Sequence, residues 1–199
     1  MYHPSLDEIK ARAGEGSLIP IYRSINADLE TPVSAYLKVA KPPYSFLLES
    51  VTGGENIGRY SFIGTEPYRV LKTGPGEENG EVDPLTLVQE EMDRHKLIPV
   101  PGLPRFHGGG VGYLAYDTIH YFEPRVPIMP DDPQGLPESV FMFSDTLLIF
   151  DHVRHDIKIV SHVRINEDLE REYNNAVSKI DELAERLSRP LVLPDELIK

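Results

Sequence analysis

The longest regular pattern of apolar and polar positions lies near the C-terminal end of the chain. After Asn166, apolar residues recur every three or four positions, which is the spacing of one face of an α-helix. The pattern stops before Pro190, because proline is not tolerated inside a helix. The residues that carry it are Leu169, Tyr173, Ala176, Val177, Ile180, Leu183, Ala184 and Leu187. We therefore predict a long amphipathic helix that begins after Asn166.

Three earlier helices are predicted from their capping residues. Ser5, with Glu8 three positions later, forms a possible capping box for a short first helix. Thr31-Pro32 and Asp83-Pro84 each place a capping side chain before a proline at the first helical position. These signals predict helices over about residues 32–40 and about residues 84–95.

Short apolar or alternating stretches between the helices predict β-strands. They cover about residues 17–23, 44–50, 59–63 and 68–72, and are separated by Gly, Asn and Pro. Residues 146–152 and 157–165 form a predicted antiparallel hairpin with its turn around 154–156. Two proline-containing stretches, 99–104 and 124–137, are predicted loops. Because strands and helices do not alternate regularly, we expect an α+β fold with antiparallel β-sheets packed with helices.

Composition and charge exclude several classes of function. A formal net charge of −12 disfavours binding to nucleic acid or to anionic membranes. No apolar run approaches the roughly 20 residues of a membrane-spanning helix, and the first residues include Asp7 and Glu8 where a signal peptide would be apolar. Cysteine is absent, which removes disulfides and thiolate chemistry. We expect a soluble, cytoplasmic protein with neither nucleic acid nor membrane as partner.

Three candidate chemistries are weakly supported by their context. The glycines at 108, 109, 110 and 112 follow no clear strand and no Walker lysine is present, so we interpret them as sites of close backbone packing. Metal-capable side chains at 151, 152, 155 and 156 fall on the predicted hairpin turn, where polar residues collect in any case. No G-x-S-x-G nucleophile motif occurs. We therefore predict no metal site in this chain and favour neither a phosphate-binding loop nor a serine hydrolase.

The strongest candidate site lies where the apolar run 44–48, which reads as a buried strand, ends in Glu49 and Ser50. The following strand begins near Arg59, so Glu49 and Arg59 can be interpreted as a cross-strand ion pair of little energetic value. A second interpretation is a pocket for a free amino acid. Glu49 would accept from the ammonium group, while Ser50 and Arg59 would donate to the carboxylate. The apolar wall of this pocket would consist of Phe46, Leu47, Leu48 and Phe62.

The same segment carries a family resemblance. LLES (47–50) followed by VTGGENIGRYSFIG (51–64) resembles the tryptophan-binding segment of anthranilate synthase component I. The resemblance continues through DLETPVSAYLKVA (28–40), DPLTLVQEEM (83–92), PGLPRFHGGGVGYLAYDTIHYFE (101–123), DDPQGLPESVFMFSDTLLIFDHVRH (131–155) and the final helix. It therefore covers nearly the whole chain in order.

The resemblance implies the N-terminal portion of the anthranilate synthase component I fold. It implies a regulatory domain over 1–188, the start of an interdomain linker over 189–199, and a C-terminal chorismate-binding catalytic domain that this chain lacks. Leu48, Glu49 and Ser50 match the motif for L-tryptophan, and Arg59 matches a basic position on the next strand.

The resemblance also implies the enzymatic context of the chain. In the family, a glutamine amidotransferase subunit, component II, supplies ammonia, which converts chorismate to anthranilate and pyruvate in tryptophan biosynthesis. Magnesium belongs to the missing catalytic domain, and tryptophan acts as a feedback inhibitor. This chain alone is therefore expected to be inactive as a lyase. Two alternatives remain open: the equivalent part of aminodeoxychorismate synthase component I, and a stand-alone amino-acid sensor.

Overall fold

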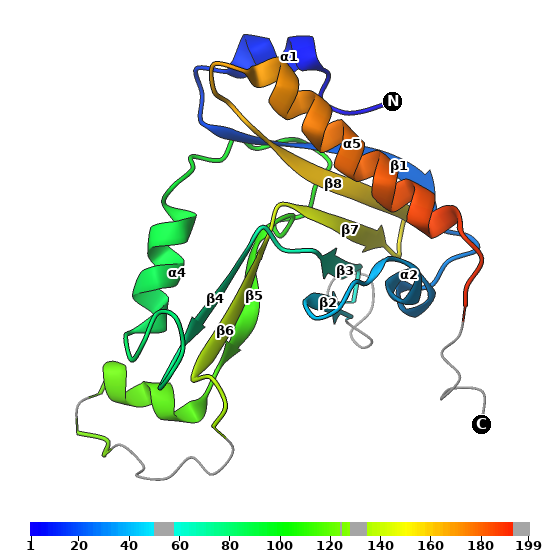
Figure 1. Cartoon of the computed structure of the whole chain (residues 1–199). Helices are drawn as coiled ribbons and strands as arrows, with labels where there is room; N and C mark the ends of the chain where they lie inside the picture. The colour runs from blue at the N-terminus through cyan, green and yellow to red at the C-terminus, as the bar shows by residue number, and fades with distance from the viewer. Residues whose placement is uncertain (50–57, 124, 128–134, 193–199) are drawn as a thin grey trace. The chain divides into compact units, whose positions relative to one another are not determined.

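The computed structural model describes residues 1–49, 58–123, 125–127 and 135–192. The chain divides into two compact units, which are considered separately (Figure 1). The first unit comprises residues 1–67, 95–108 and 145–199, and the second comprises residues 68–94 and 109–144. The stretch predicted as one regulatory domain, 1–188, is thus divided between both units, and the predicted linker 189–199 is grouped with the first unit. The domain assignment stays a prediction.

The first unit is built on an antiparallel sheet of five strands in the order β1-β8-β7-β3-β2. These strands are β1 (Leu18–Asn26), β2 (Ser45–Leu48), β3 (Tyr60–Thr65), β7 (Thr146–Asp151) and β8 (Asp156–Arg164). The predicted β7–β8 hairpin is confirmed. β1 is longer than predicted because it pairs with β8 as far as Asn26, opposite Asp156. β2 forms one edge of the sheet, so its prediction as a buried strand was wrong.

Three helices of the first unit begin at the predicted capping residues or close to them. α1 (Leu6–Arg12) and α2 (Pro32–Val39) both start with a capping box, on Ser5 and Thr31. α5 (Leu169–Ser188) lies along β8 and β1, as Figure 1 shows. Its apolar face enters the main core, which also contains Ile9, Ile19, Ile21, Ile63, Leu148, Phe150, Ile157, Ile159 and Val163. Each fully buried aliphatic side chain contributes about 1.5–3 kcal/mol, so burial of this face stabilises α5.

The opposite face of the five-stranded sheet carries a smaller core. Leu147, Ile149 and Val160 are almost completely buried there. The segment 95–108 contributes Leu103 and Phe106, which pack against them. Successive side chains of a strand point to opposite faces, so the apolar runs of β7 and β8 supply both cores. The candidate site residues are positioned by this smaller core.

The second unit contains an antiparallel sheet in the order β4-β6-β5. Its strands are β4 (Arg69–Thr73), β5 (Gly109–Leu114) and β6 (Ser139–Ser144), accompanied by α4 (Pro84–Met92) and the 3₁₀ helix η1 (Tyr116–Tyr121). β5, β6 and η1 were not predicted from the sequence, and α4 ends three residues before its predicted end. The interpretation of the glycines as sites of close backbone packing is confirmed for Gly112, where a Cβ would lie 1.9 Å from the Val140 carbonyl oxygen. The neighbouring Gly108 and Gly110 face the side chains of His162 and Phe143 instead. The fold class is the predicted one, α+β with antiparallel sheets packed with helices.

Candidate functional site

The predicted binding residues lie around the end of β2 and the start of β3. Leu48 is the last residue of β2 and keeps 43% of its surface exposed, which is unusual for a leucine in a sheet. Glu49 follows it and is exposed. Ser50 lies outside the described residues. Arg59 directly precedes β3 and is partly exposed, so the described members of the predicted site are accessible to a ligand.

The sheet separates the predicted apolar wall into two faces. The register pairs Leu48 with Phe62 and Phe46 with Gly64, which places Phe46, Leu48 and Phe62 on the face of the smaller core. Leu47 points to the other face and packs against the main core, so it is not part of this wall. Phe106, which the sequence did not indicate, contacts Phe62 edge to face with ring centroids 5.1 Å apart. The wall that the structure assembles is therefore Phe46, Leu48, Phe62 and Phe106.

Arg59 is held by Asp151 rather than by Glu49. Its Nε and Nη2 atoms donate to the two carboxylate oxygens of Asp151 at 3.0 and 2.7 Å. The β2–β3 register, extended by one residue, places Glu49 opposite Ser61 and not opposite Arg59. Among the described residues the Glu49 side chain makes no ion pair. The cross-strand pair considered from the sequence is therefore not the pair formed here, and the Glu49 carboxylate stays accessible.

Asp151 is the buried member of this pair, with 3% of its side chain exposed. Burial alone would raise its carboxyl pKa, but the hydrogen bonds from Arg59 and from the backbone N–H groups of Val153 and Arg154 lower that pKa below its usual value. The carboxylate is therefore charged at neutral pH. Asp151 was considered from the sequence only as a metal-capable residue. Its role as the partner of Arg59 follows from the pairing of β3 with β7, which places Tyr60, the residue after Arg59, opposite Asp151.

Two of the other metal-capable residues of the β7–β8 turn, His152 and Asp156, have partners of their own. The ring Nε2 of His152 lies 2.8 Å from Ser61 Oγ, and Asp156 accepts from Lys158 at 2.7 and 2.9 Å. Across the part of the chain that the structure describes, no group of three or more His, Cys, Asp or Glu side chains could hold a metal ion. In the same residues no helix has the length and apolar character needed to cross a membrane.

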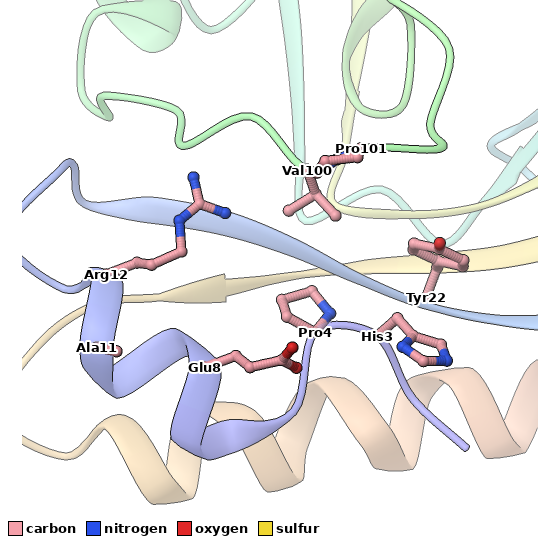
Figure 2. A pocket seen from close by; sticks show the side chains of 8 residues that line it. All are labelled: His3, Pro4, Glu8, Ala11, Arg12, Tyr22, Val100 and Pro101. Carbon is pink, nitrogen blue, oxygen red and sulfur yellow. The ribbon is translucent and has the colours of Figure 1, made fainter.

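A separate cavity of about 450 Å³ lies beside β1 (Figure 2). It is lined by His3, Pro4, Glu8, Ala11, Arg12, Tyr22, Val100 and Pro101. Its two charged groups already serve local structure, because Glu8 accepts from Ser5 in the α1 capping box and Arg12 donates to Glu15. None of the predicted binding residues lines this cavity. It is therefore not the site that the sequence indicated.

The comparison with protein families agrees with this architecture. The model for the family described as chorismate binding enzyme matches residues 43–197, and the chain belongs to this family. Among its relatives, the chain is 44% identical over 200 residues to "Probable anthranilate synthase component 1" of Schizosaccharomyces pombe, covering 98% of this chain and 40% of that protein. It is 40% identical over 190 residues to "Anthranilate synthase component 1" of Acetivibrio thermocellus, covering 90% of this chain and 38% of that protein.

A solved structure supports the same relationship at the level of the fold. Anthranilate synthase component I from Streptococcus pneumoniae matches with a TM-score of 0.54 and 27% sequence identity. The match covers 86% of this chain and 38% of that structure. The chain thus spans about two fifths of the length of the curated relatives it matches, and has the fold of the corresponding portion of anthranilate synthase component I.

Proposed function

We propose that this chain is the tryptophan-binding regulatory portion of an anthranilate synthase component I. The observation that carries the proposal is the 44% identity to a relative of that name over 98% of this chain. Leu48 and Glu49, the described residues of the motif that we propose to bind the ligand, lie at the exposed end of β2. In such an enzyme, bound L-tryptophan favours a conformation that holds chorismate poorly. The coupling is reciprocal in binding terms, so chorismate opposes tryptophan equally.

The reaction of the complete enzyme involves groups that we do not assign to this chain. Chorismate and ammonia, supplied from glutamine by a component II subunit, yield anthranilate and pyruvate. A C-terminal chorismate-binding domain holds the magnesium and the catalytic residues. We therefore expect no anthranilate from this chain alone. Its partners are L-tryptophan, that domain and the amidotransferase subunit.

The chemistry of the β2–β3 end fits a zwitterionic amino acid with an aromatic side chain. The exposed Glu49 carboxylate can accept from an ammonium group, and the Arg59 guanidinium can donate to a carboxylate. Phe62 and Leu48 offer an adjoining apolar surface for the indole ring. Ser50 is proposed from the motif alone, as a further hydrogen-bond donor to the ligand.

Calorimetric titration of this chain with L-tryptophan tests the proposal. Glu49→Gln removes the charge that faces the ammonium group while nearly preserving the shape of the side chain. Loss of one such partner in a desolvated pocket costs about 1–3 kcal/mol, which is roughly five- to 150-fold in Kd. Glu78→Gln, an exposed position of the second unit, is the matched control and should leave Kd unchanged.

Two results would contradict the proposal. The first is the absence of any heat of binding with L-tryptophan, and the second is equal affinity for L-tryptophan in the Glu49→Gln and unaltered chains. L-phenylalanine is titrated in parallel, because a general amino-acid sensor would bind both ligands with similar affinity.

A further inference from the structure

The guanidinium of Arg59 is fixed from several directions by its neighbours. Asp151 accepts two parallel hydrogen bonds from it, at 3.0 and 2.7 Å. The Arg59 carbonyl oxygen accepts from the backbone N–H of His152 at 2.9 Å, so the backbone is also tied to the end of β7. The Tyr60 ring lies under the guanidinium, with Cζ 4.9 Å from the ring centroid. An arginine held in this way loses little conformational freedom when a ligand binds.

Asp151 itself is held rigidly. Its Oδ1 atom accepts from the backbone N–H groups of Val153 and Arg154, both at 3.2 Å. Its position at the end of β7, opposite Tyr60 of β3, is set by the sheet register. With only 3% of the side chain exposed, the carboxylate has little access to solvent and has no freedom to follow Arg59 elsewhere. Asp151 therefore determines the direction in which the Arg59 guanidinium points.

One edge of the Arg59 guanidinium is left available. Nε and Nη2 donate to Asp151, whereas Nη1 makes no hydrogen bond to any residue that the structure describes. The side chain keeps 33% of its surface exposed. A planar guanidinium with one edge occupied by a buried carboxylate presents its other donors in a fixed direction, which suits a second carboxylate.

We propose that Asp151 is a positioning residue, which orients Arg59 so that its Nη1 edge receives the carboxylate of a bound amino acid. This inference rests on the proposed function and adds a residue that the motif does not contain. Asp151 does not touch the ligand and acts only through Arg59. Its negative charge weakens the attraction of Arg59 for another anion, so orientation and charge have opposite effects on affinity. The sign of the change in Kd therefore distinguishes them.

The test is titration of the Asp151→Asn chain with L-tryptophan, with folding checked by circular dichroism. If orientation dominates, Kd rises roughly tenfold, within the range of coupling between residues in contact. In an Arg59→Ala background, Asp151→Asn should cause no further change in Kd, because the arginine that it orients towards the ligand is gone; the second partner of Asp151, Arg154, is not part of the proposed site. A merely structural role would not produce this non-additivity. Asp151→Glu, which restores the charge, should recover part of the lost affinity.

Asp28→Asn is the matched control. Asp28 is an exposed aspartate of the same unit, so its removal should leave Kd unchanged. An unchanged or lower Kd for Asp151→Asn overturns the inference and leaves the proposed function standing, whereas an unaltered chain that does not bind tryptophan overturns both. If Asp151→Asn does not fold, Arg59→Lys replaces it, because lysine keeps the charge but cannot form two parallel bonds. Unaltered affinity in Arg59→Lys would also overturn the inference.

Discussion

Acidification should destabilise the first unit through a pair of histidines, His107 and His162. Nδ1 of His107 and Nε2 of His162 are 3.2 Å apart, and the two rings stack with centroids separated by 5.3 Å. Nδ1 of His162 also lies 3.0 Å from the Asp145 carbonyl oxygen. Burial lowers the pKa of both histidines, and that of His162 falls to about 4. The nearby Lys179 ammonium lowers the His162 pKa further, while Asp145 raises it.

The direction of the pH effect follows from the proton count. In the unfolded chain His162 has its ordinary pKa of 6.5, so between pH 6.5 and about 4 the unfolded chain binds more protons than the folded one. The stability that depends on His162 being neutral is therefore complete above pH 6.5 and is lost as the pH falls towards about 4. This interval corresponds to about 3 kcal/mol at about 1.36 kcal/mol per pKa unit. That value is an upper limit, since His162 keeps some exposed surface.

Urea unfolding followed by circular dichroism at several pH values between about 7.5 and about 4.5 measures this effect. We expect the free energy of unfolding to fall by about 2–3 kcal/mol over that interval. In His162→Gln the fall should be much smaller, because the buried titrating ring is gone. His155→Asn is the matched control: His155 is exposed at a turn with φ 54°, a conformation that asparagine tolerates.

Two outcomes would refute this reasoning. One is a free energy of unfolding that stays constant from about pH 7 to about pH 4.5, and the other is an equal fall in the unaltered and His162→Gln chains. Carboxylates such as Asp151 do not reproduce the effect in this interval. Their lowered pKa means that their contribution is present above the ordinary carboxyl pKa and is lost only at lower pH.

Two further predictions concern the second unit. Gly112→Ala should destabilise the chain by more than about 2 kcal/mol, because the new Cβ would meet the Val140 backbone at 1.9 Å. Gly14→Ala is the control and should change the melting temperature little, because nothing lies within 4 Å of its Cβ. Equal melting temperatures for the two variants would contradict the β5–β6 packing. Glu91→Gln should cost about 1–3 kcal/mol, since it weakens the hydrogen bonds of a buried carboxylate that pairs with the partly exposed Arg69 and Arg94 and ties α4 to β4. Urea unfolding with the exposed Glu90→Gln as control tests this, and a Glu91→Gln chain as stable as the control would show that the pair contributes nothing.

The sequence identified the elements whose signals are local. The starts of α1 and α2 follow from side chains that satisfy the first free N–H groups of a helix, and these contacts span only three residues. The position of α5 follows from an apolar period that needs no knowledge of its partner. The β7–β8 hairpin joins neighbouring stretches through a short turn. In each case the residues that determine the structure lie within a few positions of one another.

The candidate site was only partly predictable. The end of β2, with Leu48 and Glu49, was found from an apolar run that stops at polar residues. The assignment of Leu47 to the same wall was wrong, because which face each side chain takes depends on the register with β3. Phe106 lies just after the stretch 99–104, which the sequence predicts as a loop, and no local pattern marks it as part of a site. Its place in the wall results from packing against the sheet.

Tertiary structure alone decided the pairings between distant parts of the chain. The sequence of β5 is rich in glycine and has no apolar alternation, yet it is a strand because β6 supplies its hydrogen-bond partners and Gly112 allows the close approach. Arg59 and Asp151 are 92 positions apart, and no local pattern connects them. They meet because β3 and β7 are neighbours in the sheet, and strand order is set by the burial of both sheet faces at once, which no single segment of the sequence encodes.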